Sequence, residues 1–373
     1  MLKFNYIIFR FVRDMKIVYV TLSFDITSKK VGGGEISNRE IFKELSNKEN
    51  VFVISLMGGA GWNDRYYNIT CFDISSLLNK FFLSNRISKV IGFLLFKYFV
   101  WRLLRKIQPE FVIGATKSIG IVESFCRNRN TKSGVIIRAY ENFHIKNDLR
   151  AMIKKIILGD FSKKTVNKMD FIITNSKFME KECRKLTTVE RIHIFYPTIN
   201  IKQRNIEVLN KINTIGMVSN RVEKGYNIFL KVRKKFPNIN FMVLGANNDY
   251  RDKENNIDFF KWTSMPEMIL EKMDLILVPS IIDETFGRVS VEALRLGKRV
   301  LVSNRGGLPE TVDFNEKLIV KSGNHENWIK SVNYYVSNPN CYNDDLKYIA
   351  QKSECFSVDI QINDLLIFLN EVK

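Results

Sequence analysis

The 373-residue chain lacks the residue patterns that mark a disulfide framework or a metal site. Its five cysteines are scattered, odd in number and never arranged as Cys-x-x-Cys, which argues for a reducing compartment and against a zinc site. Its three histidines, His144, His193 and His325, lie far apart and have no metal-ligand spacing. An Asp-x-Asp carboxylate pair is also absent, so we expect neither a metal nor another cofactor.

Long apolar runs, internal repeats and low-complexity tracts are absent as well. The most apolar stretch, around Val90–Trp101, is too short to span a bilayer and is interrupted by Lys97. The first 14 residues have only a short apolar run, broken by Arg10, which makes a signal peptide a poor interpretation. We expect residues 1–14 to be an N-terminal extension ahead of a first strand that begins near Lys16.

Acidic residues are scarce in the first half of the chain. Residues 1–200 hold 34 Lys and Arg against 17 Asp and Glu, whereas residues 201–373 hold 24 against 22. The overall net charge of +19 is therefore concentrated in the first half, which favours a polyanionic ligand or an anionic surface as a partner.

One basic segment has no acidic residue at all, from position 74 to position 109. Its seven cations alternate with aromatic residues; the cations are Lys80, Arg86, Lys89, Lys97, Arg102, Arg105 and Lys106. A basic, aromatic-rich helix suits the plane of an anionic membrane surface. A core helix with a solvated basic face is the alternative interpretation.

The length predicts two domains, because one hydrophobic core seldom serves so many residues. Short apolar strands alternate with amphipathic helices, which predicts α/β architecture with two doubly wound, Rossmann-like sheets. The predicted domains are residues 15–200, with a basic surface, and 201–355, after a polar linker at 198–211. Residues 356–373 are predicted to form a C-terminal helix that returns to the first domain.

The most informative stretch of the second half is Asp274–Val312, which reads as strand, loop, helix, strand, glycine-rich turn and helix. Glu284 follows the first strand, and Glu292 lies about one turn inside the next helix. Ionised carboxylates accept strong hydrogen bonds from vicinal hydroxyl groups. The first amides of that helix, at Gly287, Arg288 and Val289, favour an anion, so the stretch offers sites for a polyol and for a phosphate.

The wider pattern is Pro-Ser, Glu-Thr-Phe-Gly, Glu-Ala, Gly and then Gly-Gly-Leu-Pro-Glu. It resembles the donor-site signature of family 4 of the retaining glycosyltransferases, which have the GT-B fold with two domains facing a central cleft. The resemblance implies that Glu284 and Glu292 bind a nucleotide sugar. It also places Thr285, Phe286, Gly287, Arg288 and Val289 among the substrate-binding residues.

Other parts of the chain agree with the resemblance to different degrees. Lys224-Gly225 matches the family's Lys-Gly at a helix start. Arg221 lies about two residues closer to the lysine than is usual in the family. Lys224 and Arg221 are both predicted to neutralise the donor diphosphate. Gly33 and Gly34 match a Gly-Gly loop of the first domain. Arg138 is a candidate phosphate contact or a structural ion-pair partner, because the sequence has Arg138, Tyr140 and Glu141 where family members often have a histidine.

The resemblance implies a hexosyltransferase that moves a sugar from a nucleotide-diphosphate sugar to an acceptor hydroxyl with retention. With the basic first half, it predicts a glycan or lipid-linked acceptor in surface polysaccharide synthesis, at the inner face of the cytoplasmic membrane. Alternatives are a sugar-nucleotide epimerase of the same fold, a silent homologue, or a basic nucleic-acid- or membrane-binding protein. No nucleic-acid-binding module is recognised, so we expect no nucleic-acid partner.

Overall fold

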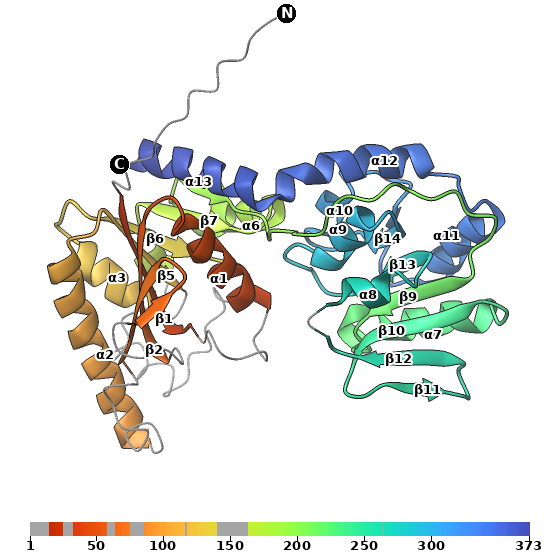
Figure 1. The fold of residues 1–373 in the computed structure, drawn as a ribbon, viewed down its shortest axis with the longest axis horizontal. Helices are drawn as coiled ribbons and strands as arrows, with labels where there is room; N and C mark the ends of the chain where they lie inside the picture. The colour runs from red at the N-terminus through yellow and green to blue at the C-terminus, as the bar shows by residue number, and fades with distance from the viewer. Residues whose placement is uncertain are drawn as a thin grey trace, which may run out of the picture. The chain divides into compact units, whose positions relative to one another are not determined.

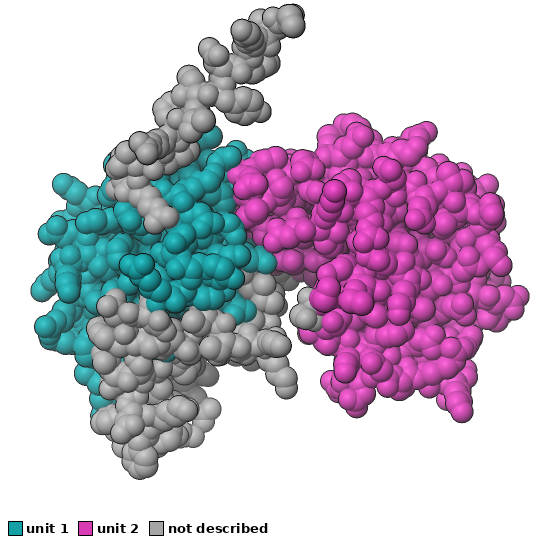
Figure 2. All heavy atoms as spheres, viewed as in Figure 1, with its two compact units in different colours: residues 1–174, 182–193, 362–373 teal, residues 175–181, 194–361 magenta. Residues whose placement is uncertain are grey.

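The computed structural model describes residues 15–24, 33–57, 64–74, 86–115, 118–139, 163–263 and 265–373. The chain divides into two compact units, coloured teal and magenta in Figure 2. Unit 1 comprises residues 1–174, 182–193 and 362–373, and unit 2 comprises residues 175–181 and 194–361. The predicted extension at 1–14, and Tyr140 and Glu141, lie outside the described residues.

Unit 1 is built on an eight-stranded sheet with the order β3-β4-β2-β1-β5-β6-β7-β8 (Figure 1). Its strands are β1 (Lys16–Ser23), β2 (Asn50–Met57), β3 (Asp64–Tyr66), β4 (Ile69–Asp73), β5 (Phe111–Ala115), β6 (Lys132–Ile136), β7 (Phe171–Thr174) and β8 (Ile192–Ile194). The strands from β4 to β7 pair in parallel, and β3 is antiparallel to β4. The carboxyl ends of these parallel strands therefore share one edge of the sheet.

Strand β1 lies at the centre of this sheet, with Val18 opposite Phe52 of β2 on one side and Val112 of β5 on the other. Ile17 and Val20 are completely buried. A parallel strand covered on both faces requires such a continuous run of apolar, β-branched residues. The first apolar run after the extension therefore forms the middle of the unit 1 core.

Helices cover both faces of the unit 1 sheet, with α1 on one face and α2 and α3 on the other (Figure 1). The helices with residues in this unit are α1 (Gly33–Leu45), α2 (Arg86–Ile107), α3 (Ile119–Cys126), α5 (Lys163–Val166), α6 (Lys177–Leu186) and the end of α13 (Val358–Val372). The Asn175-Ser176 pair after β7 predicts that Ser176 caps the next helix, and its Oγ accepts a hydrogen bond of 3.0 Å from the amide of Met179 in α6.

Unit 2 contains a seven-stranded sheet with the order β11-β12-β10-β9-β13-β14-β15. Its strands are β9 (Thr214–Val218), β10 (Asn240–Ala246), β11 (Tyr250–Asp252), β12 (Ile257–Lys261), β13 (Leu275–Val278), β14 (Arg299–Ser303) and β15 (Ile319–Val320). All neighbours pair in parallel except β11 and β12. Strand β9 lies between β10 and β13, so the sheet extends in both directions from its first strand, as a doubly wound sheet does.

The helical segments of unit 2 follow its strands. They are η4 (Val222–Lys224), α7 (Tyr226–Lys235), α8 (Glu267–Leu270), α9 (Arg288–Arg295), α10 (Leu308–Thr311), α11 (His325–Ser337), α12 (Asn343–Lys352), η5 (Ser353–Phe356) and the start of α13. The core includes Trp328 and Leu346, which are completely buried. Helix α13 contributes its residues up to 361 to unit 2 and its residues from 362 to unit 1.

Two predicted elements have different bounds in the structure. The residue pattern predicts a helix over 118–129, whereas α3 ends at Cys126, because Arg127 has a ψ of 126° and Asn128 then adopts a positive φ of 60°. The strand predicted at 135–138 instead covers 132–136, since its pairing with β5 begins at Lys132, before the apolar residues start. Pairing with a neighbour, which local hydrophobicity does not reveal, sets these strand ends.

No described helix is long and apolar enough to cross a membrane. Helix α2 contains the apolar stretch around Val90–Trp101, and it carries Lys97, Arg102 and Arg105 along its length.

Candidate functional site

The candidate donor site lies where β9 and β13 of unit 2 end. These strands are parallel neighbours, with Leu275 opposite Ile215, so the segments that follow them leave the same edge of the sheet. Lys224 belongs to the short turn after β9, and Glu284 belongs to the loop after β13. Ligands of open α/β sheets bind at this edge.

Lys224 and Glu284 are in direct contact, although 60 positions separate them in the sequence. The Lys224 Nζ atom donates to Glu284 Oε1 over 2.5 Å, and the hydroxyl of Ser280 donates to the same oxygen over 2.5 Å. The side chains of Lys224 and Glu284 are 23% and 17% exposed. A cation and a carboxylate are thus fixed side by side and remain accessible to solvent.

Gly225 allows the turn that carries Lys224 to pack against the end of β13. It has a φ of 84°, and a Cβ atom there would lie 1.9 Å from the carbonyl oxygen of Pro279. The amide of Ile281 also donates to the carbonyl of Glu223 over 3.1 Å. A larger residue than glycine would separate the two segments, so the Lys-Gly pair serves the geometry as well as the charge.

The Gly306-Gly307 turn holds the loop of Glu284 from the other side. The amide of Gly307 donates to the carbonyl of Glu284 over 2.7 Å. A Cβ atom on Gly306, which has a φ of 58°, would lie 2.1 Å from the same oxygen. The two glycines therefore allow the backbone contact that fixes the position of Glu284.

Helix α9 begins beside this loop, with Gly287 as its N-terminal cap residue at a φ of 125°. The hydroxyl of Ser290 donates to the carbonyl of Gly287 over 2.6 Å and lies 2.6 Å from the hydroxyl of Thr311, in α10. The first amides of a helix lack partners within the helix, and those of α9 include Arg288 and Val289. The start of α9 is thus a suitable place for an anion.

Glu292 lies in the second turn of α9, and the Arg288 Nε atom donates to its Oε1 over 3.3 Å. The side chain of Glu292 is 11% exposed and that of Arg288 is 33% exposed. The pair therefore places a second carboxylate and a second cation on the helix that follows Glu284.

Thr285 and Phe286, between Glu284 and α9, have structural partners. Thr285 Oγ1 accepts a hydrogen bond of 3.1 Å from the side-chain amide of Asn175. The ring of Phe286 is only 3% exposed and contacts the rings of Tyr196 and Phe356. The side chain of Phe286 therefore packs in the unit 2 core and anchors the loop.

Arg221 is not brought into this cluster by its described contacts. Its Nε atom lies 3.3 Å from Glu223, and its side chain is 62% exposed.

Trp262 follows strand β12 and is 62% exposed, and a Cβ atom on Gly245 would lie 3.5 Å from its ring. The family resemblance implies a base-binding segment near Phe260–Thr263, and this tryptophan lies within it, directly after β12.

The predicted first-domain residues gather at the carboxyl edge of the unit 1 sheet. Gly33 begins α1, and a Cβ atom on Gly34 would lie 3.8 Å from Arg138 Cδ. The Arg138 Nε atom donates to the side-chain oxygen of Asn38 over 2.8 Å, and the Asn38 amide donates to the hydroxyl of Tyr19 over 3.0 Å. The glycines and Arg138 are therefore neighbours, as a shared role requires.

A cavity of about 220 Å³ lies beside this network. It is lined by Tyr19, Thr21, Leu22, Ser23, Phe24, Glu35, Asn38 and Ala115. The hydroxyl of Ser23 donates to Glu35 over 3.0 Å. Burial raises the pKa of Tyr19 to about 12, against smaller opposing effects of Thr21 and Asn38, so its hydroxyl stays neutral near pH 7.

Sequence reasoning assigned no role to Ser280, Glu35, Asn38 or Asn175. Ser280 follows a strand-ending proline and lies four residues before Glu284, which is the one local signal for its role. The contacts of Asn38 with Arg138 and of Asn175 with Thr285 join residues 100 and 110 positions apart. No local sequence pattern reports contacts over such separations.

Comparisons with known proteins give a family match for the second half of the chain and structural matches for its fold. The family described as glycosyl transferases group 1 matches residues 200–353, which hold Lys224, Glu284 and Glu292. No curated protein is similar enough in sequence to match the chain.

Solved structures resemble the whole chain. Sucrose-phosphate synthase from Thermosynechococcus elongatus has a TM-score of 0.71 at 13% identity, over 96% of this chain and 99% of that one. HepE from Anabaena, in complex with UDP, has a TM-score of 0.71 at 15% identity, over 96% and 100%. The lipopolysaccharide outer core galactosyltransferase WaaB has a TM-score of 0.68 at 13% identity, over 96% and 99%.

At these identities the likeness establishes the fold, and the family match is confined to the second half of the chain. The predicted GT-B architecture is confirmed for the two α/β units. The chain therefore has the GT-B fold of glycosyltransferases, and its residues 200–353 carry the match to glycosyl transferases group 1.

Proposed function

We propose that this protein is a retaining glycosyltransferase that moves a hexose from a nucleotide-diphosphate sugar to an acceptor hydroxyl. The observation that carries the proposal is the contact of Lys224 with Glu284 at the carboxyl edge of the unit 2 sheet. A cation for a diphosphate and an acid for sugar hydroxyls lie within one hydrogen bond of each other. HepE of Anabaena is described in complex with UDP and with UDP-glucose, which supports a nucleotide sugar as the donor here.

In this proposal different residues of unit 2 bind different parts of the donor. Lys224 and the first amides of α9 meet the diphosphate, with Arg221 as a further cation. Glu284 holds hydroxyls of the transferred sugar, and Glu292 holds the ribose. The hydroxyl of Ser280 keeps Glu284 in place by donating to its Oε1.

The reaction breaks the bond between the anomeric carbon and the diphosphate oxygen, and the electron pair leaves with the diphosphate. A bond then joins the anomeric carbon to the acceptor oxygen on the same face of the sugar, and the proton of the acceptor hydroxyl passes to the departed diphosphate. Negative charge grows on the leaving oxygen, and fixed donors next to a growing charge lower the barrier. We propose that Lys224 and the start of α9 supply this stabilisation without a metal ion.

We further propose that unit 1 takes the acceptor. The cavity beside Glu35 and Asn38 offers a carboxylate and an amide to acceptor hydroxyls, and Gly33, Gly34 and Arg138 lie next to it. A glycan or lipid-linked acceptor for surface polysaccharide synthesis fits the basic charge of this half of the chain. Docking on the inner face of the cytoplasmic membrane through α2 brings such an acceptor to the enzyme.

The first experiment is a thermal-shift screen against a panel of nucleotide sugars. A bound donor at 100 to 1,000 times its Kd stabilises a protein by about 3–4 kcal/mol. Turnover of the best donor is then measured for Glu284→Gln and Lys224→Ala. We expect kcat to fall roughly 100-fold in each, the scale on which single charge-stabilising groups act.

Two exposed residues of the same unit serve as matched controls, Glu316→Gln and Lys330→Ala. Both controls should keep the activity and melting temperature of the parent protein. The proposal is wrong if no nucleotide sugar shifts the melting temperature, or if the Glu284 and Lys224 variants turn over as fast as the controls. An inverted anomeric configuration in the product would reject only retention.

A further inference from the structure

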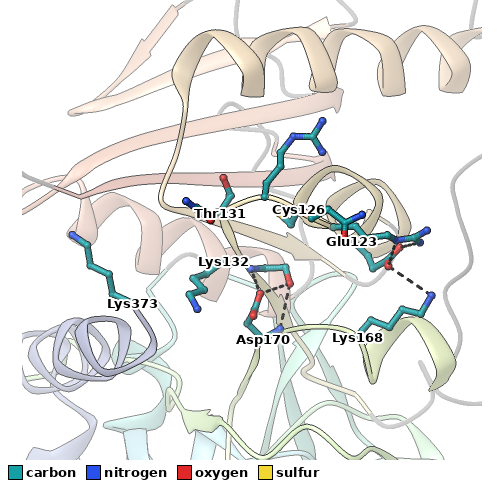
Figure 3. Close-up of a pocket in the computed structure, with 12 residues that line it drawn as sticks. Glu123, Cys126, Thr131, Lys132, Lys168, Asp170 and Lys373 are labelled. Carbon is teal, nitrogen blue, oxygen red and sulfur yellow. Dashed lines mark hydrogen bonds and ion pairs between the residues drawn. The ribbon is translucent and has the colours of Figure 1, made fainter.

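A larger cavity lies in unit 1, at the opposite edge of the sheet from the proposed acceptor residues. It encloses about 600 Å³. Its lining residues come from the end of α3, the loop before β6, the turn before β7 and the end of the chain (Figure 3). Because these segments precede β6 and β7, the cavity lies at the amino ends of the strands. The proposed sugar transfer leaves it without a role.

Cations dominate the lining of this cavity. Five basic side chains face two carboxylates, and four of the remaining residues carry neutral side-chain donors: Asn128, Asn130, Thr131 and Ser133. The basic residues are Arg127, Arg129, Lys132, Lys168 and Lys373. A concave wall lined by charges of one sign concentrates the field in the solvent that it encloses.

Both carboxylates are engaged by neighbouring groups. Glu123 receives two hydrogen bonds from the guanidinium of Arg127, at 2.9 and 2.7 Å, and the Lys168 Nζ atom lies 3.8 Å away. Asp170 accepts from the amide and the hydroxyl of Ser133, each at 2.7 Å. A third lining cation, Lys373, pairs with Glu110, so acids engage Arg127, Lys168 and Lys373, and the surplus of positive charge lies on Lys132 and Arg129.

Lys132 is the clearest part of that surplus. It is the first residue of β6, and it has no acidic partner among the residues that the structure describes. Nearby, the guanidinium of Arg129 lies over the rings of Trp101 and Phe125, at 5.2 and 4.6 Å from their centroids. Stacking holds this second cation at the rim in a fixed orientation.

We propose that this cavity binds the phosphate group of a phosphorylated molecule. A phosphate carries up to two negative charges and several acceptor oxygens, which matches donors that converge from three separate segments. Lys132 makes the central contact, and Arg127 and Lys168 add contacts from the rim. A cavity of about 600 Å³ has room for a phosphorylated small molecule or for a lipid headgroup.

Hydrogen exchange of the full chain with inorganic pyrophosphate tests the proposal and localises the binding. We expect pyrophosphate to protect the amides of residues 126–133. In Lys132→Ala, the pyrophosphate concentration needed for half-maximal protection should rise about tenfold, because a charge-assisted hydrogen bond is lost. Lys132→Arg should restore binding, and Lys330→Ala on α11 controls for the loss of one exposed cation. The whole series is run in Lys224→Ala, so that pyrophosphate at the proposed donor site does not contribute.

A parallel series uses vesicles of phosphatidylglycerol with phosphatidylcholine, and of phosphatidylcholine alone. Protection of 126–133 by pyrophosphate identifies a free phosphorylated ligand. Lys132-dependent protection by the anionic vesicles alone identifies a lipid headgroup. The inference is overturned if neither probe protects 126–133, or if Lys132→Ala and Lys330→Ala respond alike. These outcomes are independent of whether the Glu284 variant loses sugar transfer.

Discussion

The positions of two charged side chains, Lys224 and Glu284, depend on glycines in the turns beside them. Each follows a different strand. Gly225 lets the turn of Lys224 approach Pro279, and the Gly306-Gly307 turn approaches the backbone of Glu284. The glycines are needed for close approach, since a Cβ atom at Gly225 or Gly306 would lie about 2 Å from a carbonyl oxygen. Backbone packing therefore positions the charges before any ligand contributes.

Burial of the His193 side chain lowers the free energy of unfolding in acid. Its ring stacks on Phe368, with centroids 4.9 Å apart, and burial lowers its pKa to about 4. The unfolded chain takes up this proton near pH 6.5, whereas the folded chain resists until about pH 4. Stability is therefore fully present above pH 6.5 and is lost as the pH falls towards 4.

We predict that His193→Phe removes this acid sensitivity while it keeps the stacking on Phe368. Between pH 7 and pH 5, the free energy of unfolding of the parent should fall by about 2 kcal/mol more than that of the variant. Urea unfolding at the two pH values measures the difference. Ile367→Phe, at an exposed position of α13 that carries no ionisable group, is the control and should keep the parental slope. Equal slopes for His193→Phe and the parent would refute the prediction.

At the scale of elements, α2 is the candidate for membrane contact. Ile91, Leu94 and Tyr98 are 40%, 53% and 56% exposed, and their spacing of three and four residues places them on one helix face. Lys97, Arg102 and Arg105 lie along the same helix and line a surface hollow with Leu94 and Tyr98. An apolar stripe flanked by cations suits the interface of an anionic bilayer.

We predict that the protein floats with vesicles that contain phosphatidylglycerol, and less so as salt rises, because salt screens the cations. Changing Leu94 and Tyr98 together to Ser should weaken binding about tenfold or more, since each buried apolar side chain contributes about 1.5–3 kcal/mol. Tyr334→Ser, at a 48% exposed tyrosine of α11, should have no effect. Equal, salt-insensitive flotation with neutral and anionic vesicles would rule out this role for α2.

The elements themselves were predictable to different degrees. The bounds of β7 and β14 agree with the prediction, because each is a short run of residues buried in a parallel sheet. The antiparallel edge strands β3 and β11 escaped prediction. Each has three residues and depends on pairing with β4 or β12, so three residues of sequence carry too little periodicity to reveal it.

The excess of positive charge lies in the first half of the chain, whereas the residues proposed to bind the donor lie in the second half. Residues 1–200 hold twice as many basic as acidic residues, 34 against 17, and residues 201–373 are nearly balanced. Every residue proposed for the donor, from Arg221 to Glu292, belongs to unit 2. Binding of the nucleotide part of the donor is therefore expected to stabilise unit 2 first.

We predict that a nucleoside diphosphate, chosen by the thermal-shift panel, protects residues 219–225 and 279–292 from hydrogen exchange. Strand β1 and helix α1 of unit 1 should show little protection from the nucleotide alone. Lys224→Ala should abolish the protection, and Lys330→Ala should leave it intact. Protection that is as strong in β1 as in unit 2 would contradict this division of the donor.

The sequence by itself determined the alternation of strands and helices, the two-domain organisation of the fold and the family resemblance of Asp274–Val312. These follow from signals within a few residues of each other, namely apolar runs, caps and glycine turns. Only the tertiary structure decided that Lys224 contacts Glu284, that Asn38 joins Arg138, and that cations surround a cavity at the amino ends of β6 and β7. Strand order brings those residues together across separations such as 37, 60 and 100 positions, and strand order depends on the packing of the entire sheet rather than on any local pattern.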